Sequence, residues 1–319
     1  MNPEVKKGRT FAIVSHPDAG KTTMTEKFLW YGQVIREAGH VRAKANRSHT
    51  VSDWMQIEQQ RGISVSSSVL NFPFESCQFN LVDTPGHQDF CEDTYRALTA
   101  VDSALVLIDS VNGVEVQTIK LMEVCRMRKT PIITFINKMD LEGKNVLELL
   151  DEIEDILQIK VCPFTLPIGV GKLFKGIYDI QDHSFHTFNK AENKQEIIQM
   201  TGPNDPKLVE ICGENWVELF LEQYEMVTEG MEAFDHEQYL QGKMSPVFFG
   251  SAVNNFGVRQ LLNAFATLAP PPIPRESDLR VIDPSEEEFS AFVFKIQANM
   301  DPKHRDRTAF LRICSGAFT

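Results

Sequence analysis

The segment SHPDAGKTT, residues 15–23, combines a lysine and hydroxyl side chains with small residues in the manner of a phosphate-binding loop. Gly20, Lys21 and Thr22 complete the second half of the pattern GxxxxGK followed by Ser or Thr, and Ser15 stands where that pattern begins with glycine. Backbone N–H groups of such a loop point inward at the head of a helix and create an anion site. We therefore expect contacts to nucleotide phosphates from the whole loop: Ser15, His16, Pro17, Asp18, Ala19, Gly20, Lys21, Thr22 and Thr23.

Three side chains of this loop are suited to catalysis or metal binding. Lys21 supplies a positive charge to the phosphate oxygens, and the Thr22 hydroxyl can ligate Mg²⁺. Asp18 would place a carboxylate near the phosphates, where only a bound cation would tolerate it. We therefore expect Asp18 to hold a monovalent cation or to position water, and we count it with Lys21 among the catalytic candidates.

The segment DTPGHQD, which begins at Asp83, follows a short apolar run and supplies a second group of candidates. Asp83 can hold Mg²⁺ through water, and the Gly86 N–H can donate to the γ-phosphate. His87 follows that γ-phosphate sensor, so we expect it to orient the attacking water, although a lone histidine after a turn is more often a surface residue. The nucleotide contacts expected here are Asp83, Thr84, Pro85, Gly86 and His87.

A third segment, NKMD, has the groups needed to distinguish guanine from adenine. The Asp140 carboxylate can accept hydrogen bonds from N1–H and the exocyclic amine of guanine, a pair of donors that adenine lacks. Lys138 can lie over the ring, and Asn137 can tie the base-reading loop to the phosphate loop. The segment therefore predicts selectivity for guanine.

Two shorter segments, GSA and QRGIS, carry little information alone, and their positions relative to the three longer segments give them a role. In the tripeptide GSA we expect Ser251 and Ala252 to contact the nucleotide, with a backbone N–H near Ala252 donating to guanine O6. QRGIS ends at Ser64, whose hydroxyl would reach Mg²⁺ only when the γ-phosphate is present. Arg61 could act as an internal arginine finger, and a solvated loop arginine is the alternative. The expected metal ligands are Thr22, Ser64 and Asp83.

Five short apolar runs lead into the phosphate, metal and base segments. Their length and turn-forming ends fit strands that are buried on both faces of a parallel sheet. Helical patterns alternate with most of the runs. We therefore expect an α/β fold with a doubly wound, mostly parallel sheet that presents ligand residues at its strand ends. The runs are 11–14, 79–82, 104–108, 132–136 and 247–249, and the helical patterns are 21–36, 116–128 and 146–157.

The remainder of the chain predicts an insertion and a second domain. The spacing after the fourth run is too long for one helix, so we expect an inserted α+β subdomain over 160–244, with an amphipathic helix at about 206–231. Closely spaced prolines followed by charges predict a stiff linker over 271–287. Two strands within FSAFVFKI and TAFLRIC predict the start of a β-barrel domain at 288–319. The nucleotide-binding domain would then span 1–270.

Composition and charge exclude several classes of protein. Hydrophobic residues make up 42% and charged residues 24%, as in ordinary globular proteins. The formal net charge of −12 argues against a protein that coats nucleic acid electrostatically, so we expect no DNA partner. The six cysteines form no CxxC pair, which predicts reduced, cytosolic thiols. Without a signal peptide or a long apolar stretch, we expect a cytoplasmic protein and no membrane partner.

In this order, SHPDAGKTT, QRGIS, DTPGHQD, NKMD and GSA resemble the motifs of the translational GTPases. SDWMQIEQQRGIS, DTPGHQDFCEDTYRALTAVD, PIGVGKLFKGIYDI and FVFKIQANMDPKHRDR resemble more narrowly the class-II bacterial release factors, the family of peptide chain release factor three. The resemblance implies GTP, GDP and Mg²⁺ as ligands. It also implies a ribosome-stimulated GTPase that helps class-I peptide chain release factors leave the ribosome after termination.

The resemblance also assigns residues and a chain length. It makes His87 the water-orienting histidine and places Ser64 where most relatives have Thr. The family continues through a complete β-barrel and a further domain, so we expect this chain to stop within its second domain at Thr319. Retained nucleotide binding is expected from such a chain, and ribosome-coupled recycling is in question.

Two other functions stay open. A guanine-nucleotide-binding module without productive turnover would share all the motifs, as would an elongation-type translational GTPase. A phosphate-loop kinase or ATPase fits less well, because it has no use for NKMD. The basic loop at 303–307 could contact ribosomal RNA, and a solvated hairpin end is the alternative.

Overall fold

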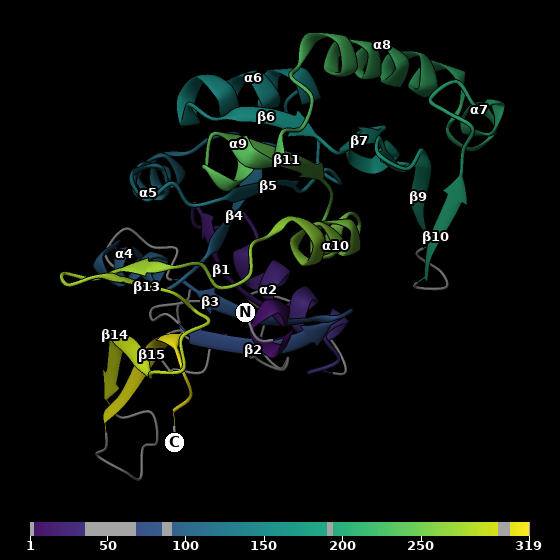
Figure 1. Ribbon diagram of the computed structural model, residues 1–319. Coiled ribbons are helices and arrows are strands. Elements are labelled where there is room, and N and C mark those ends of the chain that lie inside the picture. Colours follow the sequence, from purple (N-terminus) through teal and green to yellow (C-terminus); the bar gives the residue numbers. More distant parts are fainter. Residues whose placement is uncertain (1–2, 36–67, 85–90, 190–193, 299–306, 319) are drawn as a thin grey trace, which may run out of the picture.

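A seven-stranded sheet is the centre of the computed structural model, which describes residues 3–35, 68–84, 91–189, 194–298 and 307–318 (Figure 1). The strand order is β2-β3-β1-β4-β5-β11-β6. Strand β2 pairs antiparallel with β3 at one edge, and every other pairing is parallel. The strands are β1 (Gly8–Ser15), β2 (Ser68–Phe74), β3 (Cys77–Asp83), β4 (Ser103–Asp109), β5 (Ile132–Asn137), β6 (Lys160–Pro163) and β11 (Met244–Phe249).

Helices cover both faces of this sheet because successive side chains of a strand point in opposite directions. In β1, Phe11 and Ile13 enter one core with residues of α2, α9 and α10, whereas Ala12 and Val14 enter the other with residues of α4, α5 and α6. The predicted doubly wound α/β fold with a mostly parallel sheet is therefore confirmed. These helices and the short N-terminal one are α1 (Pro3–Lys7), α2 (Lys21–Tyr31), α4 (Cys91–Thr99), α5 (Val116–Met127), α6 (Val146–Leu157), α9 (His236–Leu240) and α10 (Val258–Leu268).

Helix α2 is shorter than its sequence pattern predicted. It ends at Tyr31, and the following Gly32 N–H donates to the Phe28 carbonyl at 2.9 Å. Gln33 then adopts a φ of 58°, a left-handed conformation that cannot continue a right-handed helix. The predicted extension toward residue 36 is therefore wrong.

The segment between β5 and β11 adds a strand to the main sheet and builds a second sheet. Strand β6 pairs with β11, and the next four strands form an antiparallel sheet in the order β10-β9-β8-β7. The long helix that we predicted at 206–231 is two helices, because Gly213 interrupts it with a φ of 90°. These elements are β7 (Thr165–Ile168), the 3₁₀ turn η2 (Gly171–Leu173), β8 (Gly176–Asp179), β9 (Ser184–Asn189), β10 (Lys194–Gln199), α7 (Pro206–Cys212) and α8 (Glu214–Gly230).

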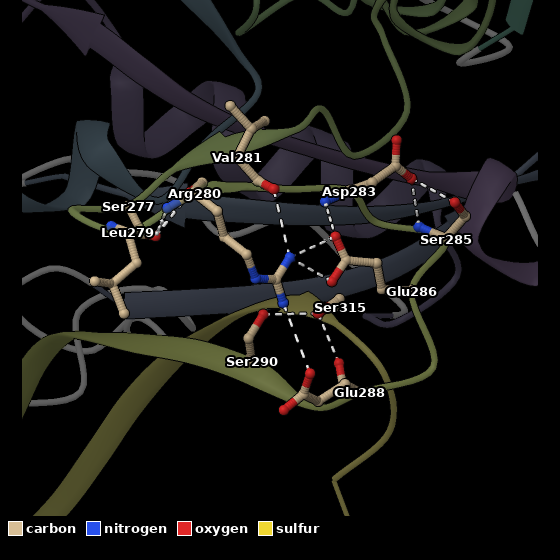
Figure 2. A network of polar contacts seen from close by, with 10 residues as sticks. All are labelled: Ser277, Leu279, Arg280, Val281, Asp283, Ser285, Glu286, Glu288, Ser290 and Ser315. Atoms are coloured by element: carbon tan, nitrogen blue, oxygen red, sulfur yellow. Dashed lines mark hydrogen bonds and ion pairs between the residues drawn. The ribbon is translucent and has the colours of Figure 1, made fainter.

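A polar network organises the segment that leads out of the main sheet. Figure 2 shows Arg280 donating to both carboxylate oxygens of Glu286, at 2.8 and 2.7 Å, with Glu288 3.7 Å away. Nearby, the hydroxyls of Ser290 and Ser315 lie 2.7 Å apart and join the two final strands. The stretch that we expected to be a stiff linker thus contains a small hairpin with its own side-chain contacts. Its strands are β12 (Arg275–Glu276) and β13 (Val281–Ile282), and the final strands are β14 (Ser290–Ala298) and β15 (Arg307–Ser315).

One buried carboxylate joins these last elements to the main sheet. Asp102 precedes β4, and its side chain is fully buried between two arginines. Arg275 donates to Asp102 Oδ1 at 2.8 Å, and Arg312 donates to Asp102 Oδ2 at 2.7 Å. The same guanidinium groups donate to carbonyls just after α4, at Ala100 and Val101. Strand β14 also packs against α4, so the final hairpin contacts both that helix and, through Arg312, the buried carboxylate that follows it.

Candidate functional site

The candidate residues that the structure describes lie at one edge of the main sheet. Strands β1, β3, β4, β5 and β11 are parallel, so their carboxyl ends meet there. These ends are Ser15, Asp83, Asp109, Asn137 and Phe249. The loops that follow them carry the phosphate, metal and base segments, which is the usual place for a ligand in an open α/β sheet.

The phosphate loop forms a tight turn between β1 and α2. Asp18 has a φ of 65° and Gly20 a φ of 101°, so the chain bends through left-handed conformations just before the helix. A Cβ on Gly20 would lie 2.3 Å from Asn137 Nδ2, so only glycine fits. The N-cap residue of α2 is Gly20, and no side-chain cap is present among the described residues, so the first N–H groups of the helix are suited to donate to a ligand. An anion matches this arrangement.

The side chains of the loop divide between the interior and the surface. Ser15, Ala19 and Lys21 are buried, and the Ser15 hydroxyl has no hydrogen-bond partner among the described residues. The Asp18 side chain is exposed. His16 Nε2 lies 3.4 Å from the Glu115 carboxylate, so this imidazole contacts a neighbouring loop of the chain. The four remaining members of the set, Pro17, Gly20, Thr22 and Thr23, are half-buried.

Asn137 connects the phosphate loop with the loop after β11. Its Nδ2 donates to the Ala19 carbonyl at 2.8 Å, and its Oδ1 accepts from the Ala252 N–H at 2.9 Å. Asn137 is 2% exposed, so both hydrogen bonds are shielded from water. The tie that we expected from the sequence is present, and it fixes two ligand loops relative to each other.

The hydrogen bond from the Ala252 N–H to Asn137 bears on the predicted contact between Ala252 and guanine. We predicted a backbone N–H near Ala252 as the donor to guanine O6, and in this structure the Ala252 N–H already donates to Asn137. A base would have to share this donor or displace its acceptor. Ser251 beside it is buried, and its backbone pairs with Phe256.

The base-reading loop is held by a contact that the sequence did not reveal. Lys138 Nζ donates to Asp109 Oδ2 at 2.7 Å, and Lys138 has a φ of 68°. The Met139 N–H donates to the Gly250 carbonyl at 3.1 Å, and Asp140 is half-buried. Sequence reasoning omitted Asp109, although it ends an apolar run just as Asp83 and Asn137 do, and that position was the signal available.

The metal and catalytic candidates after β3 lie largely outside the described residues. Asp83 closes β3 beside β1, close in the sheet to the phosphate loop, and only its backbone is described. Thr84 is buried, and its hydroxyl donates to the Ile13 carbonyl at 2.7 Å, so this side chain already has an acceptor within the sheet. Three candidates, Pro85, Gly86 and His87, lie outside the described residues, as does Ser64.

Together, the open helix N-terminus, the buried Lys21 and the fixed loop after β5 define a phosphate-loop nucleotide-binding domain. The sequence matches the family described as elongation factor Tu GTP binding domain over residues 6–271. Residues 288–319 match elongation factor G domain 2. The first match covers well over half of the chain, which therefore belongs to the translational GTPases. This family binds and hydrolyses GTP, so GTP, GDP and Mg²⁺ are its ligands.

A solved structure supports the same fold. A crystal structure of a protein from Thermus thermophilus is similar with a TM-score of 0.74 and 25% sequence identity. The similarity covers 97% of this chain and 45% of that one. This chain therefore spans less than half the length of that relative. Within the described residues, each helix is too short or too polar to cross a membrane.

Proposed function

We propose that this chain binds GTP at the carboxyl edge of the main sheet and hydrolyses it to GDP and phosphate as part of a translation factor. The bridge through Asn137 is the observation that supports this best. It holds the phosphate loop and the Ala252 loop together through two buried hydrogen bonds. Ligand loops that are already in place lose less conformational entropy when a nucleotide binds.

The phosphates and the metal would be held by the first part of the site. Residues 15–23 would surround the phosphates with N–H groups, and Lys21 would add positive charge. Thr22 in the first turn of α2 and Asp83 at the end of β3 would hold Mg²⁺, with Ser64 as the third proposed ligand. Mg²⁺, when bound, neutralises charge that develops on the phosphate oxygens.

Hydrolysis would need an attacking water in line with the γ-phosphorus. We assign its orientation to His87, with Asp18 placing a cation or a second water. Attack forms a new P–O bond as the bond from the γ-phosphorus to the β–γ bridging oxygen breaks, giving GDP and phosphate. We expect low intrinsic turnover, because a partner would have to set His87 in place.

The base would be read by three side chains and one loop. Asp140 would accept from guanine, Lys138 would lie over the ring, and Asn137 would hold the loops together. Ser251 and Ala252 would contact the edge of the base. Only guanine presents the donor pair that Asp140 requires.

We also propose that the factor acts in translation termination, where it promotes the release and recycling of class-I release factors. The longer stretches that resemble class-II release factors support this assignment, which makes the ribosome, including its RNA, the partner and the cytoplasm the place of action. The corresponding domains would be 1–270 with the inserted subdomain 160–244, a linker at 271–287, and strands of a β-barrel domain at 288–319.

Two alternatives have support of their own. The matched families carry the names of elongation factors, which favours an elongation-type GTPase. The second alternative is a guanine-nucleotide-binding module without productive turnover, which would use the same phosphate-binding and base-reading segments.

A titration with GDP, GTP and ATP tests the base-reading proposal. We expect ATP to bind at least a hundredfold more weakly than GTP, because losing buried hydrogen bonds to a carboxylate costs about 3 kcal/mol or more. Equal affinities for ATP and GTP would refute it.

Phosphate release measured with and without ribosomes tests the enzymatic proposal. We expect ribosomes to stimulate turnover, and His87→Ala to abolish the stimulation while GDP binding is kept. Rapid hydrolysis without ribosomes would refute the activation scheme. Recycling of a class-I release factor, compared with translocation on the same ribosomes, separates the termination and elongation roles.

A further inference from the structure

We propose that Asp109 is a positioning residue for guanine binding, which acts by holding Lys138 in place along the base-binding loop. The inference rests on the proposed guanine-nucleotide function of this site. It assigns Asp109 no contact with the base.

The carboxylate of Asp109 is held firmly by its surroundings. Asp109 is the last residue of β4, and its side chain is 4% exposed. Its Oδ1 accepts from the Val111 N–H at 2.8 Å, and its Oδ2 lies 3.4 Å from Asn112 Nδ2. The turn that follows β4 therefore holds the carboxylate in place independently of Lys138.

The register of the sheet brings this carboxylate to the base-reading loop. Asp109 pairs with Asn137 across β4 and β5, and Lys138 is the next residue along the chain. Lys138 Nζ donates to Asp109 Oδ2 at 2.7 Å. An exposed pair of this kind would contribute little, but here one partner is almost fully shielded from water. The ammonium group is therefore anchored at one point.

Anchoring the ammonium group orders the whole lysine side chain. A free lysine has many rotamers, and fixing them upon ligand binding opposes the binding. With its end held by Asp109, the four-carbon stem of Lys138 is fixed at both ends as an apolar strip. The ring of a base could then pack against the stem without first having to order it.

Loss of the carboxylate should leave the backbone of the region intact. The Ser110 N–H donates to the Asn137 carbonyl at 2.9 Å, and the Gly113 N–H donates to the Asp109 carbonyl at 2.7 Å. Neither bond involves a side chain, and the first joins the loops after β4 and β5 directly. Asp109→Ala would leave the Val111 N–H without this acceptor, whereas the amide oxygen of Asp109→Asn can still accept from it. Asp109→Asn therefore acts on Lys138 more than on the fold.

The test measures GDP dissociation and affinity in Asp109→Asn, Asp109→Ala, Lys138→Ala and the Asp109→Ala/Lys138→Ala double variant. We expect each Asp109 variant to release GDP about tenfold faster and to bind it about tenfold more weakly. Inosine diphosphate should lose the same factor, because a lysine stem packs against the ring face and does not read its edge. In the Lys138→Ala background, removal of Asp109 should have no further effect.

The control is Glu232→Gln, which breaks an ion pair with Lys160 at the opposite, amino-terminal edge of the sheet. It should release GDP at the wild-type rate, and both it and Asp109→Asn, which keeps an oxygen for the Val111 N–H, should melt close to the wild-type temperature. Wild-type GDP release in Asp109→Asn, or an undiminished effect of Asp109→Ala in the Lys138→Ala background, would overturn this inference alone. A wild-type protein that binds no guanine nucleotide would overturn the proposed function and the inference with it.

Discussion

Replacement of Asp102 by alanine should destabilise the protein more than any exposed substitution, because Asp102 neutralises two arginines in the interior. Its side chain is fully buried, and those of Arg275 and Arg312 are 12% and 9% exposed. The carboxylate accepts from both guanidinium groups at 2.8 and 2.7 Å. Burial lowers the pKa of Arg275, and Asp102 opposes that shift by favouring the charged form.

The magnitude follows from what remains after the substitution. Two guanidinium groups would stay close together with no carboxylate between them, each keeping its hydrogen bonds to the carbonyls after α4. Removing one partner of a buried ion pair costs about 3–5 kcal/mol. For a protein of this size that corresponds to a fall in melting temperature on the order of 10 °C. The final hairpin should separate from α4 before the main sheet unfolds.

Scanning fluorimetry and hydrogen exchange of β14 and β15 measure the two effects. Glu286→Gln is the matched control, because it removes an equally close arginine contact that lies at the surface. We expect no measurable change in that variant. A melting temperature for Asp102→Ala within about a degree of wild type, with unchanged exchange in the hairpin, would refute the reasoning.

Three further substitutions test other parts of the structure. Asn137→Ala leaves the Ala19 carbonyl and the Ala252 N–H unpaired in the interior, so it should lower the free energy of unfolding by about 2 kcal/mol. It should also weaken GDP binding in a calorimetric titration, and unchanged binding would contradict the bridging role. Gly20→Ala would put a Cβ 2.3 Å from Asn137 Nδ2 at a φ of 101°, and we expect loss of GDP binding in the same assay. Burial, with repulsion from Asp182, raises the pKa of Asp179 to about 6. The folded state therefore binds the proton more tightly than the unfolded state does, and the free energy of unfolding falls as the pH rises from about 4 to about 6. Asp179→Asn should therefore stabilise the protein by about 1–2 kcal/mol at about pH 7 and by nothing near pH 4, as denaturant unfolding at the two pH values would show.

The five strands that carry the site could be predicted because parallel strands covered on both faces are continuous apolar runs. The runs at 11–14 and 104–108 are of this kind, and they became parts of β1 and β4. The same rule failed at the margins of the sheet. Edge strand β2 contains Pro73, whose missing N–H is tolerated at an edge, and β6 has only 4 residues, one of them Pro163.

The break between α7 and α8 was missed for a related reason. Apolar residues recur at helical spacing on both sides of Gly213, so the pattern reads as one helix. The backbone changes direction at this glycine, where φ is 90°. Because hydrophobic spacing reports which face of a segment is buried, it cannot by itself show a turn between two helices that bury similar faces.

The sequence alone shows which chemical groups follow the strands of the site. The positive charge of Lys21 and the acceptor oxygens of Asp140 are properties of the residue types, so they can be recognised before the fold is known. The tertiary structure decided which of these groups already have partners. It paired the Ala252 N–H with Asn137, the Thr84 hydroxyl with Ile13, and Lys138 with Asp109. Those contacts join residues far apart in the chain. Only the register of the parallel strands, which local sequence does not encode, brings them within hydrogen-bond distance.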